Sequence, residues 1–170
     1  MGLIEKYAYR RLYKKAASID RRVKLPHPET VRKVGILWEP SENQAFQFLN
    51  DHFSRSQSIV RNICIYPNNA TAEPGANVLT AKDLNWLGFP KPGLVDDFIS
   101  AEFDLLLNLA LTQTLPFDYI TALSRACFKV GWSPKETNFF DLNINIEGKP
   151  EALYLARQQI FYLGQLNKTM

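Results

Sequence analysis

The stretch Val34-Gly35-Ile36-Leu37-Trp38 is the apolar centre of a segment from Val31 to Glu39, and Pro40 ends it. A strand with one wet face alternates apolar and polar residues, whereas an unbroken apolar run is typical of a strand buried on both faces. The segment from Phe103 to Leu111 has the same character. These two segments predict a parallel sheet that is covered on both sides.

Helix signals lie between the strand candidates. Ser41 can cap a helix that runs to about Arg55, Pro116 suits the first turn of another, and a closing helix is expected from Pro150 to about Leu166. Further strands are expected at Ile59–Tyr66, Asp83–Leu87, Phe128–Trp132 and Phe139–Ile146, with a short helix at Leu94–Ser100 and a loop at 67–82. In the last of these strands, alternation places Phe140, Leu142, Ile144 and Ile146 on one side. Strand–helix–strand units of this length imply parallel strands. The expected fold is α/β, a three-layer sandwich with a mostly parallel sheet of five or six strands, Rossmann-like or flavodoxin-like, plus a basic N-terminal helix.

Positive charge is concentrated at the start of the chain. The net charge is +3, but residues 1–33 carry +7 and the remainder carries −4. Residues 2–20 predict an amphipathic helix, with Glu5 as an interruption of its apolar stripe, and two prolines make 21–30 a linker. We therefore expect a basic helix and linker over residues 1–30 and a single α/β domain over 31–170.

The basic helix suggests an anionic partner. Lysines and arginines interleaved with Tyr7, Tyr9 and Tyr13 are typical of contact with a nucleic-acid backbone, including that of the ribosome. The same pattern also fits an anionic membrane surface or a protein partner, and equally a helix that packs on the body and solvates its charges. The residues expected to contact an anionic partner are Lys6, Arg10, Arg11, Lys14, Lys15, Arg21 and Arg22.

Familiar catalytic motifs are missing from the sequence. It contains no Gly-x-Gly-x-x-Gly, no Gly-Lys-Ser/Thr phosphate loop and no Gly-x-Ser-x-Gly elbow. Its two histidines are 25 residues apart, and Cys64 and Cys127 sit in apolar runs, where we expect buried thiols. The sequence therefore predicts no metal site, no cofactor and no catalytic residue, and it favours a binding or interaction module.

An enzyme, or a former enzyme, is the alternative. Ligands of open α/β sheets bind outside the carboxyl ends of the strands, and the polar residues expected there are Glu39, Ser41, Asn68 and Asn108. A sugar or a nucleotide is the ligand class that we weigh for this edge. The three tryptophans, Trp38, Trp86 and Trp132, are expected in the core rather than around a pocket.

Four segments carry a family resemblance: Phe103–Leu109, Pro116–Ile120, Leu123–Ala126 and Phe128–Gly131. They resemble a family of short, uncharacterised bacterial proteins from the Bacteroidetes group, for which only a domain of unknown function is recorded. The resemblance implies no activity and no site residues. Because no secretory signal and no long apolar run occurs, we expect a cytoplasmic location.

Overall fold

The computed structural model describes residues 1–68, 70, 75 and 77–169. Within them the strands form one sheet in the order β3-β2-β1-β4-β5-β6, and every neighbouring pair is parallel. The strands are β1 (Lys33–Trp38), β2 (Ile59–Ile65), β3 (Val78–Leu79), β4 (Leu105–Asn108), β5 (Lys129–Gly131) and β6 (Leu142–Asn143). This arrangement confirms the predicted α/β class with a parallel sheet.

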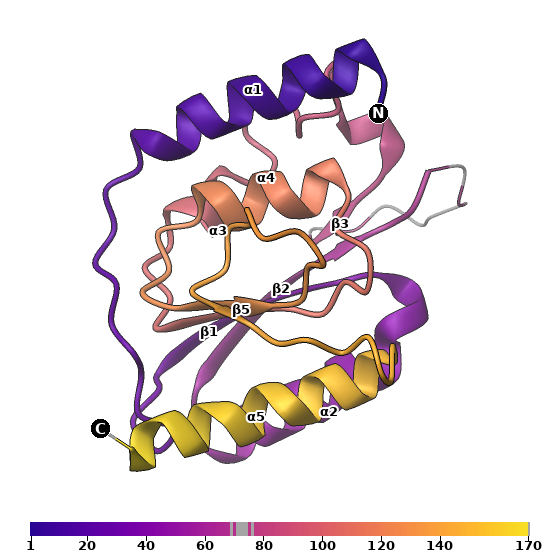
Figure 1. Cartoon of the computed structure of the whole chain (residues 1–170). Coiled ribbons are helices and arrows are strands. Elements are labelled where there is room, and N and C mark those ends of the chain that lie inside the picture. Colours follow the sequence, from indigo (N-terminus) through magenta and orange to yellow (C-terminus); the bar gives the residue numbers. More distant parts are fainter. Residues whose placement is uncertain (69, 71–74, 76, 170) are drawn as a thin grey trace.

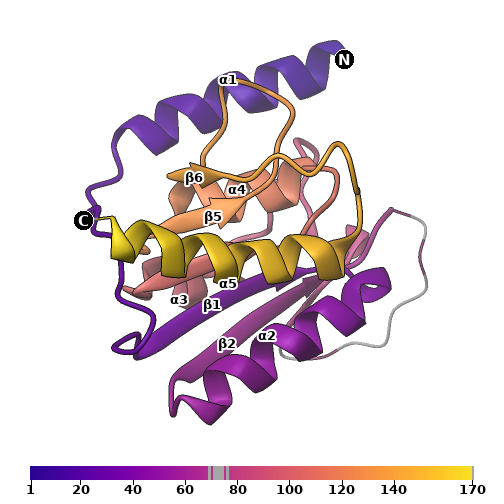
Figure 2. The same cartoon turned by 60° about the horizontal axis from the view of Figure 1, so that its bottom comes forward.

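Helices cover both faces of the sheet (Figure 1). One face carries α2 (Asn43–Arg55) and α5 (Ala152–Lys168), which lie side by side (Figure 2). The other face carries α3 (Asp96–Ser100) and α4 (Leu115–Leu123), and α1 (Leu3–Ala17) packs on the outer side of α4. The N-terminal helix is thus an additional layer on a three-layer sandwich.

The apolar runs of β1 and β4 are explained by burial on both faces. Ile36 and Leu107 point into the core beneath α2 and α5, whereas Leu37 and Leu106 point into the core beneath α3 and α4. Each such side chain contributes about 1.5–3 kcal/mol through the apolar surface it removes from water. At Gly35 a Cβ atom would lie 2.8 Å from the Phe103 ring, so the close approach of that ring requires glycine.

The strand expected at Asp83–Leu87 is wrong. Thr80 donates its backbone N–H to the Asp83 carboxylate over 2.8 Å, which closes a short 3-10 helix, η2 (Ala81–Asp83). The Asn85 side chain then accepts N–H bonds from Leu87 and Phe89 and holds a tight loop. The actual edge strand, β3, lies within the segment expected to be a loop, and its two residues are too few to give a recognisable pattern.

Of the strand expected at Phe139–Ile146, only β6 pairs in the sheet. The Asn143 side chain continues the pairing, because it bonds to both the N–H and the carbonyl of Ser133 over 2.8 Å. Ile144 and Ile146 are buried, as the alternation predicted. The pattern therefore identified the buried side of this segment but overestimated the length of the strand.

The strand order places a reversal between β1 and β4. From β1 the chain proceeds outward to β2 and β3, then returns to β4 on the other side of β1 and proceeds outward again. The connection that follows β1 enters α2 on one face, and the connection that follows β4 enters α4 on the other. In open α/β sheets this divergence leaves a crevice at the carboxyl ends of the two strands.

Candidate functional site

The N-terminal helix is fixed to the body through its apolar side. Ala8 and Leu12 are completely buried, and they pack in one cluster with Leu87, Phe89 and Leu123. A polar bond supports the same contact: the Tyr9 hydroxyl donates to the Asp118 carboxylate on α4 over 2.5 Å. The helix thus buries its stripe on the body, which was one of the alternatives open at the sequence level.

The solvent-exposed part of α1 displays its charges, with Lys15 at the edge of the buried stripe and the other four cations opposite it. We call the exposed residues Lys6, Arg10, Arg11, Lys14 and Lys15 the α1 basic surface. Among the described residues, the only ion pairs within 4.0 Å are Arg21–Asp141 and Lys149–Glu151. The five cations of the α1 basic surface therefore form no ion pair within 4.0 Å with a carboxylate of the described chain.

The two arginines of the linker differ in their surroundings. Arg22 is exposed, like the residues of the α1 basic surface. Arg21 instead donates to both carboxylate oxygens of Asp141, over 2.5 and 2.9 Å, and to the Ala126 carbonyl over 3.2 Å. Arg21 therefore ties the linker to the sheet, and it lies apart from the α1 basic surface.

Exposed aromatic residues adjoin the α1 basic surface. The rings of Tyr7 and Trp86 are stacked, with centroids 6.4 Å apart, and the Arg11 guanidinium lies 5.9 Å from the centre of the Tyr7 ring. The expected core position of Trp86 is wrong, because 72% of this residue is exposed. Trp132 is buried and Trp38 is half-buried against Phe46.

The strand-end crevice contains a cavity of about 480 Å³. Two of the four residues expected at this edge, Glu39 and Asn68, line it. Glu5 of α1 lines it as well, so the residue that interrupts the apolar stripe of the helix is the one that faces the cavity. The other polar lining comes from Tyr66, Thr80, Thr112, Gln113 and Thr114, and apolar lining includes Ile65, Leu79 and Phe117.

The other two expected residues lie outside this cavity. The Ser41 hydroxyl is exposed and donates to Glu39 over 2.8 Å. Asn108 is fully buried, and its amide donates to Gln113 and Thr121 over 2.9 and 3.0 Å. Asn108 therefore positions Gln113, which lines the cavity, and is itself beyond the reach of a ligand there.

A buried acid that the sequence reasoning did not single out follows β1. Glu42 closes the short 3-10 helix η1 (Pro40–Glu42), and one of its carboxylate oxygens accepts the Glu39 N–H over 2.9 Å. Its other oxygen has no hydrogen-bond partner among the described residues. Burial raises the pKa of Glu42 to about 8, against the opposing effects of the Glu39 and Leu111 backbone N–H groups, and the nearby Glu39 carboxylate adds to the rise. The spacing of Glu39 and Glu42, which is that of a capping box, was the available signal.

A second acid with a raised pKa lies under α1. Burial raises the pKa of Asp118 to about 6, against the opposing effects of the Tyr9 hydrogen bond and the Lys135 charge. Tyr13, Asp118 and Lys135 line a small cavity of about 160 Å³ beside the ends of β4 and β5. Asp118 anchors α1, since it accepts the hydrogen bond of the Tyr9 hydroxyl.

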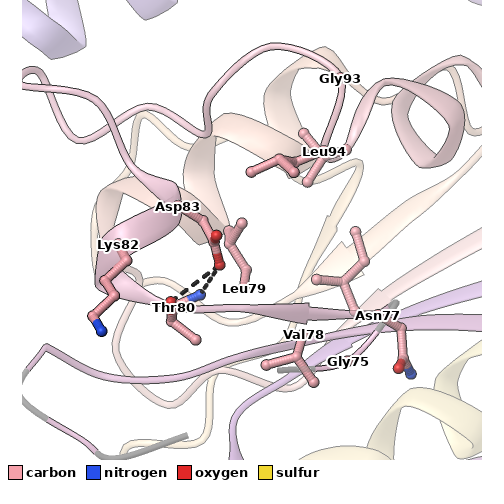
Figure 3. Close-up of a pocket in the computed structure, with 11 residues that line it drawn as sticks. Gly75, Asn77, Val78, Leu79, Thr80, Lys82, Asp83, Gly93 and Leu94 are labelled. Carbon is pink, nitrogen blue, oxygen red and sulfur yellow. Dashed lines mark hydrogen bonds between the residues drawn. The ribbon is translucent and has the colours of Figure 1, made fainter. Parts of the chain in front are cut away.

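A further cavity of about 500 Å³ lies at the β3 edge (Figure 3). Among the described residues that line it, Asp83 is the only carboxylate; it accepts bonds from the Thr80 N–H and hydroxyl, and the Lys82 side chain points away from the space between Leu79 and Leu94. Few polar groups thus remain to hold a ligand. Among the described residues no three His, Cys, Asp or Glu side chains cluster as metal ligands would.

The cysteines are free thiols. Cys64 is buried and Cys127 is half-buried. Burial raises the pKa of the Cys64 thiol to about 11, which makes it a poor nucleophile. In the part of the chain that the structure describes, no helix combines the length and the apolar character that crossing a membrane requires.

The fold and these surfaces define a small α/β protein with a Rossmann-like strand order and a charged outer helix. Residues 4–166 match the family described as "Family of unknown function (DUF6913)", and the chain belongs to this family. No curated protein and no solved structure matches the chain. The bacterial source that the resemblance implied stays a prediction.

Proposed function

We propose that this protein is a nucleic-acid-binding module whose α1 basic surface contacts the phosphate backbone, ribosomal RNA included. The observation that supports the proposal is the accumulation of five exposed cations on a single helix, four of them on the side opposite its buried stripe, without an ion-pair partner within 4.0 Å in the described chain. The opposite side of that helix is buried through Ala8 and Leu12. The charges are therefore presented on a fixed surface rather than on a mobile tail.

Binding of this kind has a predictable salt dependence. Each phosphate neutralised on a single strand releases about 0.7 of a counterion, so five contacts give a slope of about −3.5 for log K against log salt concentration. Raising the salt from about 50 to 200 mM then weakens binding about 100-fold. Binding through hydrogen bonds between neutral groups would depend very little on the salt concentration.

The test compares two variants with the same change in net charge. Lys6→Gln, Arg10→Gln and Lys14→Gln together remove three cations of the α1 basic surface, and we expect the salt slope for a 12-nucleotide RNA to fall by about 2. The control combines Arg55→Gln, Arg157→Gln and Lys168→Gln, which are exposed residues of α2 and α5 on the far side of the sheet. Equal losses in the two variants, or no RNA binding at low salt, would refute the proposal.

Substitution is preferable to removal of α1. Deleting residues 1–24 would also uncover Leu87 and Phe89, which α1 buries. A loss of binding would then be indistinguishable from a loss of folding. The surface substitutions leave the packing of Ala8 and Leu12 intact.

The membrane alternative has one observation in its favour, because Leu3 and Ile4 are exposed at the start of α1. Against it, the two residues are followed by the charged surface and not by a continuous apolar face. Vesicles that contain anionic lipid, added in place of RNA, distinguish the two partners. Binding to vesicles without binding to RNA would replace the nucleic-acid proposal.

A second candidate function is the binding of a small sugar or nucleoside at the strand ends. The cavity of about 480 Å³ that Glu5, Glu39 and Asn68 line favours it, since this volume suits a small ligand. The described residues that line the cavity include two glutamates and no lysine or arginine, so their charges oppose a phosphate group. Adenosine, ribose and adenosine monophosphate, titrated against wild type and Glu39→Gln by NMR, test this candidate; shifts with the monophosphate alone would contradict it.

A further inference from the structure

Beside the α1 basic surface, two aromatic side chains from distant parts of the chain form one exposed surface. Tyr7 of α1 and Trp86 of the loop after η2 stack with an angle of 21° between their ring planes. Tyr7 is 43% exposed and Trp86 is 72% exposed. We call this pair the Tyr7–Trp86 platform. Because Trp86 stays 72% exposed although it stacks on Tyr7, part of its ring surface is open to a partner.

The loop that carries Trp86 is held on both sides. The residues next to it are Asn85, whose side chain accepts the N–H groups of Leu87 and Phe89 over 2.9 and 3.0 Å, and Leu87, which is buried against α1. Gly88 adopts a positive φ of 92°, which favours glycine at the tight turn. Trp86 is therefore exposed on an anchored loop, so the loop loses little conformational entropy when a partner binds.

Positively charged residues of α1 adjoin the Tyr7–Trp86 platform. The Arg11 guanidinium lies 5.9 Å from the Tyr7 ring centre, and Arg10 and Lys14 follow on the exposed side of the same helix. A surface that combines an exposed aromatic face with adjacent cations complements a base that is joined to a phosphate backbone. In a duplex the base faces are stacked on one another, so only an unpaired strand offers both groups together.

We propose that the protein binds single-stranded nucleic acid in preference to duplex, with an unpaired base stacked on Trp86 and the flanking phosphates on Arg10, Arg11 and Lys14. This inference rests on the proposed function, because the phosphate contacts supply the sequence-independent part of the affinity. The platform adds preference for unpaired strands. Because every base has an aromatic face, the preference does not require a particular sequence.

The test uses Trp86→Leu and Trp86→Phe in the full chain. Leucine removes the aromatic face, and we expect it to weaken binding of a 12-nucleotide oligouridylate by about 5- to 100-fold, with binding of the matching duplex unchanged. Phenylalanine keeps a stacking face and should retain most of the affinity. The indole fluorescence of the wild type should be quenched by the single strand, and this quenching should disappear in Trp86→Phe although binding persists.

The outcomes separate this inference from the proposed function. Salt-dependent RNA binding that is equal for single strand and duplex, and unaffected by Trp86→Leu, would overturn the stacking role and leave the α1 basic surface supported. A wild-type protein without salt-dependent RNA binding would overturn both proposals. Insertion of Trp86 into anionic vesicles, seen as a blue shift of its emission, without binding to the oligonucleotide would assign the platform to a membrane and also overturn the inference.

Discussion

Ionisation of Glu42 should destabilise the folded protein above neutral pH. Glu42 is 3% exposed, and one of its carboxylate oxygens has no partner among the described residues. Burial raises its pKa from the ordinary 4.5 to about 8, with Glu39 as the nearest like charge. Between these two pH values the folded chain holds a proton that the unfolded chain has released. Stability that is present below pH 4.5 is therefore lost as the pH rises through 8.

The size of this loss follows from the same two values. At about 1.4 kcal/mol for each pH unit, the difference corresponds to about 5 kcal/mol as an upper limit. Water entry and relaxation around the ionised carboxylate reduce it, so we expect about 2–4 kcal/mol. That loss is a large fraction of the 5–15 kcal/mol by which typical domains are stable.

Urea unfolding of wild type and Glu42→Gln at pH 5, 7 and 9 tests this reasoning. Glutamine keeps an oxygen that can accept the Glu39 N–H but cannot ionise. We expect the variant to be within about 1 kcal/mol of wild type at pH 5 and more stable than wild type by about 2–4 kcal/mol at pH 9. Glu147→Gln, at an exposed position, controls for the change in net charge. Parallel stability curves for wild type and Glu42→Gln from pH 5 to 9 would refute the argument.

Two further predictions concern the attachment of α1 and a buried lysine. Leu12→Ala should lower the free energy of unfolding by about 2–4 kcal/mol in one cooperative transition, because Leu12 is fully buried. The control Ile4→Ala, at an exposed position, should change it little. Separate unfolding of α1 in urea would show that residues 1–30 are an independent unit. Burial, with Arg21 nearby, lowers the pKa of Lys129 from 10.5 to about 7, so the contribution of Lys129 to stability should increase as the pH rises from 7 to 10.5. In Lys129→Met this increase should be absent, and its persistence in thermal unfolding scans would assign it to another group.

Local sequence patterns were sufficient for the class of fold. Residues 34–38 and 105–107 are apolar on both sides of their strands, and burial on both faces is the physical condition of a parallel sheet covered by helices. The alternation around Ile144 and Ile146 likewise identified a buried side, because the two-residue period of a strand is a local property. The separation of charged from apolar residues around α1 could also be predicted from the sequence, because it follows from the helical spacing of the residues.

The candidate site could be predicted only in part from the sequence. Glu39 and Asn68 reach one cavity because parallel strands end at a common edge, as the topology predicts. Asn108 ends the adjacent strand β4 as well, yet it is sealed by Gln113 and Thr121. Position at a strand end is a matter of topology, whereas access to solvent depends on the side chains that other segments place over it.

The sequence by itself determined the parallel α/β architecture and the concentration of positive charge in the first helix, because both depend on residues close together in the chain. Only the tertiary structure decided that Arg21 is bound to Asp141, that Glu5 faces the strand-end cavity and that Trp86 stacks on Tyr7 in solvent. The reason is physical: pairing of charges, cavities and exposed aromatic surfaces arise between residues far apart along the chain. Their positions are fixed when helices and loops pack, and no local period encodes that packing.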